Sequence, residues 1–173
     1  MARDSSSRFL DVFELARARS AVCGRVPLSE LTRLAASLSG SEGDLAYEVQ
    51  GQVDGRGRPA ARVRLCGTLR LVCDRCGNAL PFELDAAAHF YFVHSEQELA
   101  RIPVEDSPEE PLLGSTRFDL LALIEDEAIL ALPISPRHLT CEGEAASATA
   151  ASDEASERPH PFAALAQLRP RRQ

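Results

Sequence analysis

The segment RVRLCGTLRLVCDRCGNALPFELDAAAHFYF, residues 62–92, decides the fold because two long alternating patterns flank one short turn. Before the turn, one face is apolar and the other polar: Val63, Leu65, Leu69 and Leu71 against Arg62, Arg64, Thr68 and Arg70. After the turn, the same period of two recurs in Leu80, Phe82, Leu84, Ala88, Phe90 and Phe92. The segment predicts an antiparallel hairpin that buries one face and carries CDRCGN at its tip.

A third strand and two short helices are predicted upstream of this hairpin. The stretch DLAYEVQGQV, residues 44–53, alternates apolar and polar side chains as a half-buried strand does. The residues DGRG at 54–57 then supply a turn into the hairpin. Farther upstream, apolar residues recur at helical spacing over 9–19 and over 29–38, which predicts two short N-terminal helices.

A buried helix is predicted downstream of the hairpin. Residues 118–132, FDLLALIEDEAILAL, are mostly apolar and end before Pro133, which predicts a helix over 118–131. Thr116 and Asp119 resemble a capping box at its start. The predicted fold class is α+β, with an antiparallel β-meander or small barrel-like sheet packed on this central helix and short N-terminal helices.

The composition predicts one folded domain followed by a tail. A chain of 173 residues with 45% hydrophobic content can bury one core, and the predicted elements place it in residues 1–141. Within it, the acidic residues 95–115 contain several Pro and Gly residues and predict a surface loop. Residues 142–158 predict an acidic flexible linker, and residues 159–173 a C-terminal docking tail with apolar residues at helical spacing.

The charge pattern limits how the protein can contact nucleic acid. The net charge is −7, which argues against coating nucleic acid through bulk positive charge. All basic residues are Arg and none is Lys, which suits bidentate contacts but is equally explained by a codon bias. The sequence shows no signal peptide and no run of roughly 18 apolar residues, so we expect a cytoplasmic protein without a membrane partner.

Two cysteine motifs predict a zinc site. Cys73 and Cys76 form a C-x-x-C motif at the hairpin tip, and His138 and Cys141 are spaced H-x-x-C after the predicted helix. The four residues together predict a Cys3His zinc knuckle. The alternative interpretation is a pair of half-buried thiols, with His138 as an ordinary loop residue. A thioredoxin-like redox role fits less well because turn and strand residues, not a helix, follow Cys76.

Two charged groups are candidate binding residues. Arg62, Arg64 and Arg70 on one strand face, with Arg75 in the turn, can follow an RNA phosphate backbone, because alternate strand residues stand about 7 Å apart. An ordinary solvated sheet face explains the same pattern. His89 and Tyr91, on the polar side of the next strand, offer rings that can stack on a base.

The acidic run Glu125, Asp126 and Glu127 is predicted to contact a protein partner, with a solvated helix face as the alternative. Three adjacent helical residues point around about 200° and cannot converge on one substrate atom. The sequence also lacks the G-x-S-x-G, Walker, G-x-G-x-x-G and H-E-x-x-H motifs. We therefore expect a protein that is not an enzyme and has no small-molecule substrate.

Three segments resemble the YceD family of large ribosomal RNA subunit accumulation proteins. They are LVCDRCGNALPFEL at 71–84, DLLALIEDEAILALPISPRH at 119–138 and HPFAALAQL at 160–168. The resemblance implies a role in the synthesis, processing or stability of large-subunit (23S) ribosomal RNA, without catalytic residues to carry over. Expected partners are precursor ribosomal RNA, a large-subunit ribosomal protein, or a ribonuclease that the protein restrains. The alternative function is a zinc- or thiol-based sensor built on Cys73 and Cys76.

Overall fold

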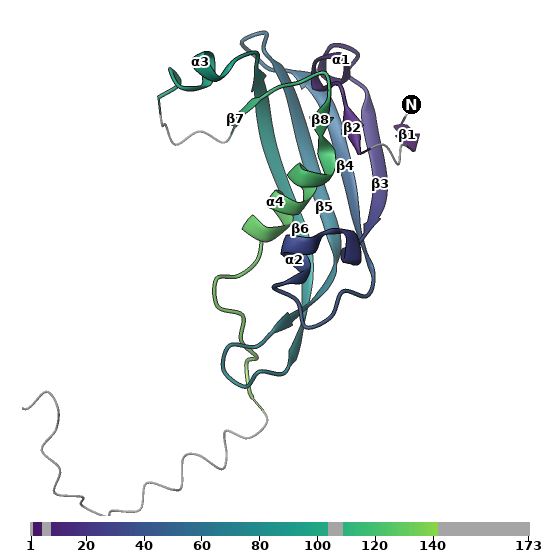
Figure 1. Ribbon diagram of the computed structural model, residues 1–173, viewed down its shortest axis with the longest axis vertical. Helices are drawn as coiled ribbons and strands as arrows, with labels where there is room; N and C mark the ends of the chain where they lie inside the picture. The colour runs from purple at the N-terminus through teal and green to yellow at the C-terminus, as the bar shows by residue number, and fades with distance from the viewer. Residues whose placement is uncertain (1, 5–7, 104–108, 142–173) are drawn as a thin grey trace, which may run out of the picture. The chain divides into compact units, whose positions relative to one another are not determined.

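The computed structural model describes residues 2–4, 8–103 and 109–141 (Figure 1). Its elements are β1 (Ala2–Asp4), β2 (Phe9–Leu10), α1 (Val12–Arg17), β3 (Ala21–Pro27), η1 (Leu28–Glu30), α2 (Thr32–Ala35), β4 (Asp44–Val53), β5 (Pro59–Val72), β6 (Ala79–Val93), α3 (Glu96–Leu99), β7 (Glu110–Leu113), β8 (Phe118–Asp119) and α4 (Leu120–Leu130). The chain divides into two units, Met1–Leu139 and Thr140–Gln173. The predicted linker and docking tail lie outside the described residues. None of the described helices is long and apolar enough to cross a membrane.

A six-stranded sheet with the order β1-β3-β4-β5-β6-β7 forms the frame of the first unit. The strands β3 to β6 pair antiparallel in succession, which confirms the predicted meander and adds β3 to it. The edge strands β1 and β7 pair parallel with their neighbours. Among the described residues these two edges do not pair with each other, so the sheet stays open instead of closing into a barrel.

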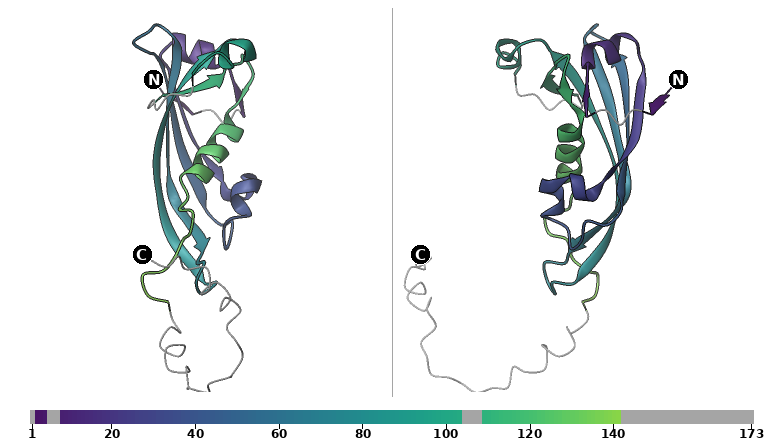
Figure 2. Two further views of the ribbon diagram at one scale, coloured as in Figure 1. Left: turned by 90° about the vertical axis from the view of Figure 1, so that its left-hand side faces the viewer. Right: turned by 45° about the vertical axis from the view of Figure 1, so that its right-hand side comes forward.

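Helices cover one face of this sheet. Figure 2 shows α4 and the η1–α2 segment on the same side. The core lies between them and the sheet, and its buried side chains include Leu45, Val49, Val63, Leu65, Leu69, Leu71, Leu84, Phe90, Leu120, Leu123 and Ile124. The polar residues of β5 are exposed on the other face. Among the described residues, the alternation in 62–92 thus separates a face that helices cover from a face that they leave uncovered.

The N-terminal helices are shorter than the helical spacing predicts. α1 begins after Asp11, whose carboxylate accepts hydrogen bonds from the backbone N–H of Phe13 (2.9 Å) and Glu14 (3.0 Å). The preceding strand β2 pairs with β8, so its backbone groups are satisfied by a strand and not by a helix. The second predicted helix consists of two short turns, η1 and α2.

The segment 95–115 contains two elements that the sequence did not predict. Helix α3 is capped by Ser95, whose hydroxyl accepts a hydrogen bond from the Glu98 backbone N–H at 3.2 Å, and β7 pairs with the end of β6. Tyr91 and Val93 are buried in a small cluster of their own, against which Leu99 and Ile102 pack. Apolar side chains on both faces at the end of β6 explain why α3 and β7 pack there.

The predicted central helix is α4, but Asp119, and not Thr116, caps it. The Asp119 carboxylate accepts a hydrogen bond from the Ala122 backbone N–H at 3.2 Å. Phe118 and Asp119 are held extended as β8, which places the helix start after them. The Arg8 guanidinium donates to the same carboxylate at 2.8 Å and lowers the pKa of Asp119.

One buried carboxylate joins the central helix to the short helix α2. Glu125, only 8% exposed, accepts hydrogen bonds from the backbone N–H groups of Arg33 (2.6 Å) and Leu34 (3.2 Å). The Arg33 side chain also donates to it at 2.9 Å. Burial raises the pKa of Glu125, but these donors outweigh burial and hold the pKa below its ordinary value.

We expect Glu125→Ala to lower the free energy of unfolding by about 2–3 kcal/mol, because it leaves buried N–H groups of α2 without an acceptor. Asp126→Ala is the control: its side chain is 52% exposed, so its ion pair with Arg33 contributes about 1 kcal/mol or less. Urea denaturation measures the free energy of unfolding of both variants.

The stabilisation by Glu125 also depends on pH. Because the pKa is lowered in the folded state, the contribution is complete above the ordinary value of 4.5 and is lost as the pH falls through the folded-state pKa. Equal stability losses in the two variants would contradict the anchoring role of Glu125.

Candidate functional site

The turn between β5 and β6 forms a compact knuckle around Cys73. The Cys73 backbone N–H donates to the Asn78 carbonyl at 2.9 Å, and the Gly77 N–H donates to the Cys73 carbonyl at 2.9 Å. Gly77 has φ +73°, a left-handed conformation that favours glycine. These bonds close the turn so that both cysteines of the C-x-x-C motif face the same side, as a metal knuckle requires.

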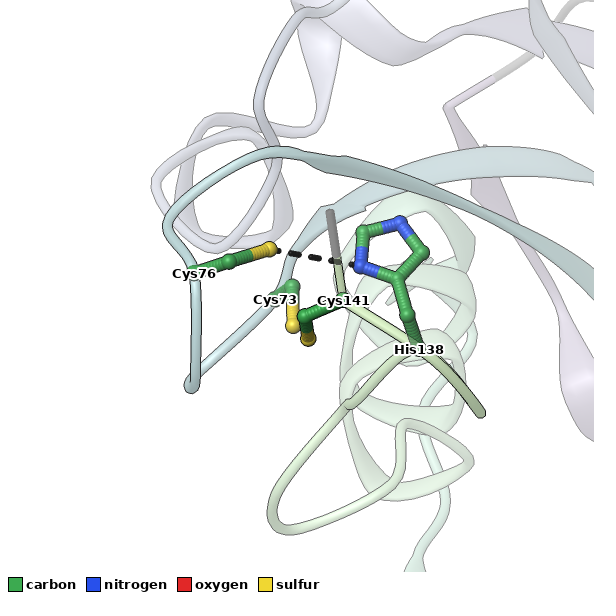
Figure 3. Close-up of side chains that lie close together, drawn as sticks. All are labelled: Cys73, Cys76, His138 and Cys141. Carbon is green, nitrogen blue, oxygen red and sulfur yellow. Dashed lines mark hydrogen bonds between the residues drawn. The ribbon is translucent and has the colours of Figure 1, made fainter. Parts of the chain in front are cut away.

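The segment after α4 brings two more ligands to the knuckle. The Asp74 backbone N–H donates to the Pro136 carbonyl at 2.8 Å, which ties this segment to the turn. The ligand atoms of Cys73, Cys76, His138 and Cys141 all lie within 4.8 Å of one another. In Figure 3 the sulfurs of Cys73 and Cys141 lie side by side, and Cys76 faces the His138 ring. The four residues predicted from the two motifs therefore come together.

The His138 ring is held in the orientation that a ligand needs. Its Nε2 atom lies 3.1 Å from the Ala79 carbonyl oxygen, which can only accept a hydrogen bond. This contact favours the tautomer with the proton on Nε2, so the lone pair of Nδ1 faces the cluster, 3.4 Å from the Cys76 sulfur. A backbone carbonyl that orients a histidine in this way is typical of metal sites. No motif in the sequence marks this carbonyl.

The electrostatics of Cys73 favour a thiolate. Its side chain is 1% exposed, and this burial raises the pKa of the thiol. Backbone N–H groups of His138, Cys76 and Arg75, together with the Cys76 side chain, interact with the sulfur and outweigh burial, so that the pKa falls to about 5. The thiolate is the form that binds metal ions, and N–H donors around a sulfur support it.

The cluster can hold a metal ion with little rearrangement. In a tetrahedral zinc site with Zn–S bonds of about 2.3 Å, two sulfurs lie about 3.8 Å apart. The largest separation here is 4.8 Å, so a contraction of about 1 Å completes the geometry. Three sulfurs and one imidazole nitrogen are the donor set of structural zinc knuckles.

The arginines predicted to bind RNA lie at two places. The uncovered face of β5 carries Arg62, Arg64 and Arg70, and the knuckle carries Arg75, all exposed. Arg64 pairs with Asp85 at 3.3 Å and Arg70 with Glu42 at 3.1 Å. Within the described ranges Arg62 makes no ion pair. Exposed pairs contribute about 0–1 kcal/mol, so phosphates can compete for these arginines.

The three acidic residues of α4 have different environments. The Glu125 carboxylate is already used inside the protein, whereas Asp126 is exposed and pairs with Arg33 at 2.6 Å. Burial raises the pKa of Glu127, and the nearby charges of Glu110 and Asp126 raise it further. Contact with a partner stays a prediction for these residues, and the geometry leaves Asp126 as the most accessible of them.

Tyr91 cannot serve as the base-stacking residue that the strand pattern suggested. It is 6% exposed, and the Arg58 guanidinium lies 3.4 Å from the centre of its ring. Asp54 holds Arg58 in place through an ion pair of 2.5 Å. The alternation in residues 79–93 is real, but α3 and β7 cover the end of the strand, which the sequence did not predict.

These features define an α+β protein with an open sheet, one uncovered face, and a four-residue knuckle that can hold a metal ion. Residues 61–169 match the family described as large ribosomal RNA subunit accumulation protein YceD, and the chain belongs to this family. It is 27% identical over 168 residues to a Haemophilus influenzae protein of that description, covering 92% of this chain and 94% of the relative. No solved structure matches the chain.

We expect the purified protein to bind one equivalent of Co²⁺ with the visible spectrum of a tetrahedral thiolate site. Cys73→Ser, Cys76→Ser and Cys141→Ser should each abolish that spectrum, because each removes one sulfur from the cluster. The matched control is Cys66→Ser, which removes an exposed thiol of β5 outside the cluster. Loss of the spectrum in the control, or its survival in Cys141→Ser, would contradict the site.

Proposed function

We propose that this protein is a non-enzymatic ribosome-biogenesis factor that supports the synthesis, processing or stability of large-subunit (23S) ribosomal RNA. Membership of the YceD family, whose description names accumulation of that RNA, carries the proposal. The relative from Haemophilus influenzae bears the same description along nearly its whole length. A cytoplasmic location, where bacterial ribosomes assemble, is part of the proposal.

The uncovered face of the sheet supports direct contact with RNA. Arg62, Arg64 and Arg70 lie on the same face of β5. Arg62 and Arg64 are about 7 Å apart along the strand, and Arg70 follows about 20 Å beyond Arg64. Their weak exposed ion pairs can exchange for phosphate contacts. The negative net charge restricts such contact to this local stripe, which distinguishes the protein from one that coats RNA.

We further propose that the knuckle holds zinc in a structural role. The donor set of three cysteines and one histidine occupies all four tetrahedral positions, which leaves none open for a substrate or an exchanging thiol. Cys73 and Cys141 are also buried. A sensor needs an accessible thiol or an open coordination position, so a zinc- or thiol-based sensor is less well supported.

The first candidate partner in this proposal is precursor ribosomal RNA. A basic large-subunit ribosomal protein is a second candidate, because Asp126 offers an exposed carboxylate on α4. A ribonuclease that the protein restrains is compatible with the same role in RNA stability.

Depletion of the protein in its own bacterium tests the role. We expect a selective shortage of large-subunit ribosomal RNA in sucrose gradients, and we expect the wild-type gene to restore it. Cys76→Ser should restore it poorly because the knuckle loses a ligand, whereas Cys66→Ser should restore it fully. Normal subunit ratios after depletion would contradict the proposal and would favour the sensor.

A further inference from the structure

The strand β6 has an open stretch along its outer edge. Its inner edge pairs with β5 from Ala79 to Tyr91, whereas on the outer edge β7 pairs only with Phe90–Val93. Figure 1 shows β7 near one end of β6. At the other end, the His138 ring lies 3.1 Å from the Ala79 carbonyl oxygen. Between these two ends, in the part of the chain that the structure describes, no strand lies beside residues 80–89.

Two hydrogen bonds show which backbone groups of β6 point to this open edge. The Ala79 carbonyl faces His138, and the Val93 carbonyl accepts from the Gly114 N–H at 2.8 Å. In a strand, the N–H and C=O of one residue point the same way, and the direction alternates along the chain, so the odd-numbered residues between these ends also face outward. The open groups are therefore the N–H and C=O of Glu83, Asp85 and Ala87 and the carbonyl of Pro81.

The side chains along the open stretch alternate between acidic and apolar. Glu83 and Asp85 are exposed on the face that the described helices leave uncovered. On the opposite face, Phe82 and Ala86 are partly buried and pack against the core. Directly opposed side chains of neighbouring strands contact each other on each face of a sheet. A strand added at this edge is therefore favoured when basic and apolar residues alternate in it.

The carboxylates of the edge remain able to accept basic partners. Glu83 accepts a hydrogen bond from the Thr68 hydroxyl at 2.9 Å, and it makes no ion pair with any described residue. Asp85 pairs with Arg64 at 3.3 Å, and both side chains are more than half exposed. A carboxylate has about four acceptor positions, so both residues can bind a further cation.

Two more carboxylates lie where the open stretch ends. Glu110 begins β7 and stands in register with Phe90. Burial raises the pKa of Glu127 on α4, and the charge of Glu110 raises it further. Neither carboxylate has an ion pair within the described ranges. A basic side chain at this end of an added strand would relieve the repulsion between them.

A second copy of the chain fits this edge less well than a basic segment does. Two copies of β6 that pair antiparallel about Leu84 overlap along the whole open stretch. This register places Glu83 of one copy opposite Asp85 of the other, and like charges directly opposite each other are destabilising. Pro81 also offers no N–H group to a neighbouring strand. RNA is disfavoured because the carboxylates repel phosphates.

We propose that the open edge of β6 binds an extended segment of a large-subunit ribosomal protein by strand addition, and that basic and apolar residues alternate in this segment. Backbone hydrogen bonds provide affinity in this mode, and the alternate side chains provide specificity. The inference rests on the proposed function, because that function names the class of partner. It assigns the protein partner to the edge of the sheet and leaves the arginines of β5 to RNA.

Calorimetry with the full chain and a synthetic peptide of alternating lysine and valine tests the edge. The wild type should bind this peptide and should bind a peptide of the same composition, with lysines and valines grouped, at least tenfold more weakly. N-methyl groups on one set of alternate amides should abolish binding, and N-methyl groups on the other set should be tolerated. Equal binding of the alternating and grouped peptides would overturn strand addition.

The test variant is Glu83→Arg, which should weaken the alternating peptide about tenfold by placing like charges side by side. The matched control is Glu48→Arg on β4, which makes the same change of charge on the same face, with β5 between it and the edge. It should leave binding unchanged. Glu83 and Glu48 are exposed, so both variants should fold, which thermal unfolding checks. Equal losses in the two variants would overturn the edge as the site.

Large-subunit ribosomal proteins freed of RNA test the source of the segment. The wild type and Glu48→Arg should retain at least one of them, and Glu83→Arg should lose it. If neither the peptide nor these proteins bind while depleted cells lack large-subunit RNA, the inference is overturned and the proposed function stands. If the peptide binds but depleted cells keep normal subunit ratios, the proposed function fails, and with it the ribosomal source of the segment.

Discussion

The difference in length between the hairpin strands and the helix that covers them constrains the whole structure. β5 has 14 residues and spans about 46 Å, whereas α4 has 11 residues and spans about 16 Å. The helix alone therefore cannot cover the apolar face of the hairpin. The η1–α2 segment, tied to α4 by Glu125, extends the cover. The knuckle then joins the turn of the hairpin to the chain after α4, where a metal ion would add four bonds to the contact between Asp74 and Pro136.

This arrangement places the buried core and the exposed arginines on opposite faces of the sheet. Leu65, Leu69 and Leu71 are buried beneath the helices, while the arginines between them face outward along the uncovered side. A substitution among the arginines should therefore leave the core intact. A substitution in the knuckle should disturb the turn of the hairpin more than the exposed face of the sheet.

The features of the fold that leave a regular pattern in the sequence could be predicted from it. The alternation in residues 62–92 predicted the hairpin and its two faces, and the spacing of Cys73, Cys76, His138 and Cys141 predicted a cluster that the structure brings together. The rest depends on tertiary contacts that leave no local pattern. Glu125 looks like a member of an acidic surface run, and only the position of α2 makes it an internal hydrogen-bond acceptor. Tyr91 stands at a position of the alternating pattern that predicts an exposed side chain, and only the packing of α3 and β7 buries it.

We propose above all that the uncovered face contacts RNA directly through its arginines. The most direct measurement is the salt dependence of binding to single-stranded large-subunit RNA fragments, compared between the wild type, Arg62→Ala and Arg17→Ala. Arg17 is a matched control because it is exposed on α1, away from that face. Arg62→Ala should reduce the slope of log affinity against log salt by about 0.7, the value for one phosphate contact on a single strand, and Arg17→Ala should leave it unchanged. Equal slopes in all three proteins would contradict direct RNA contact by this face.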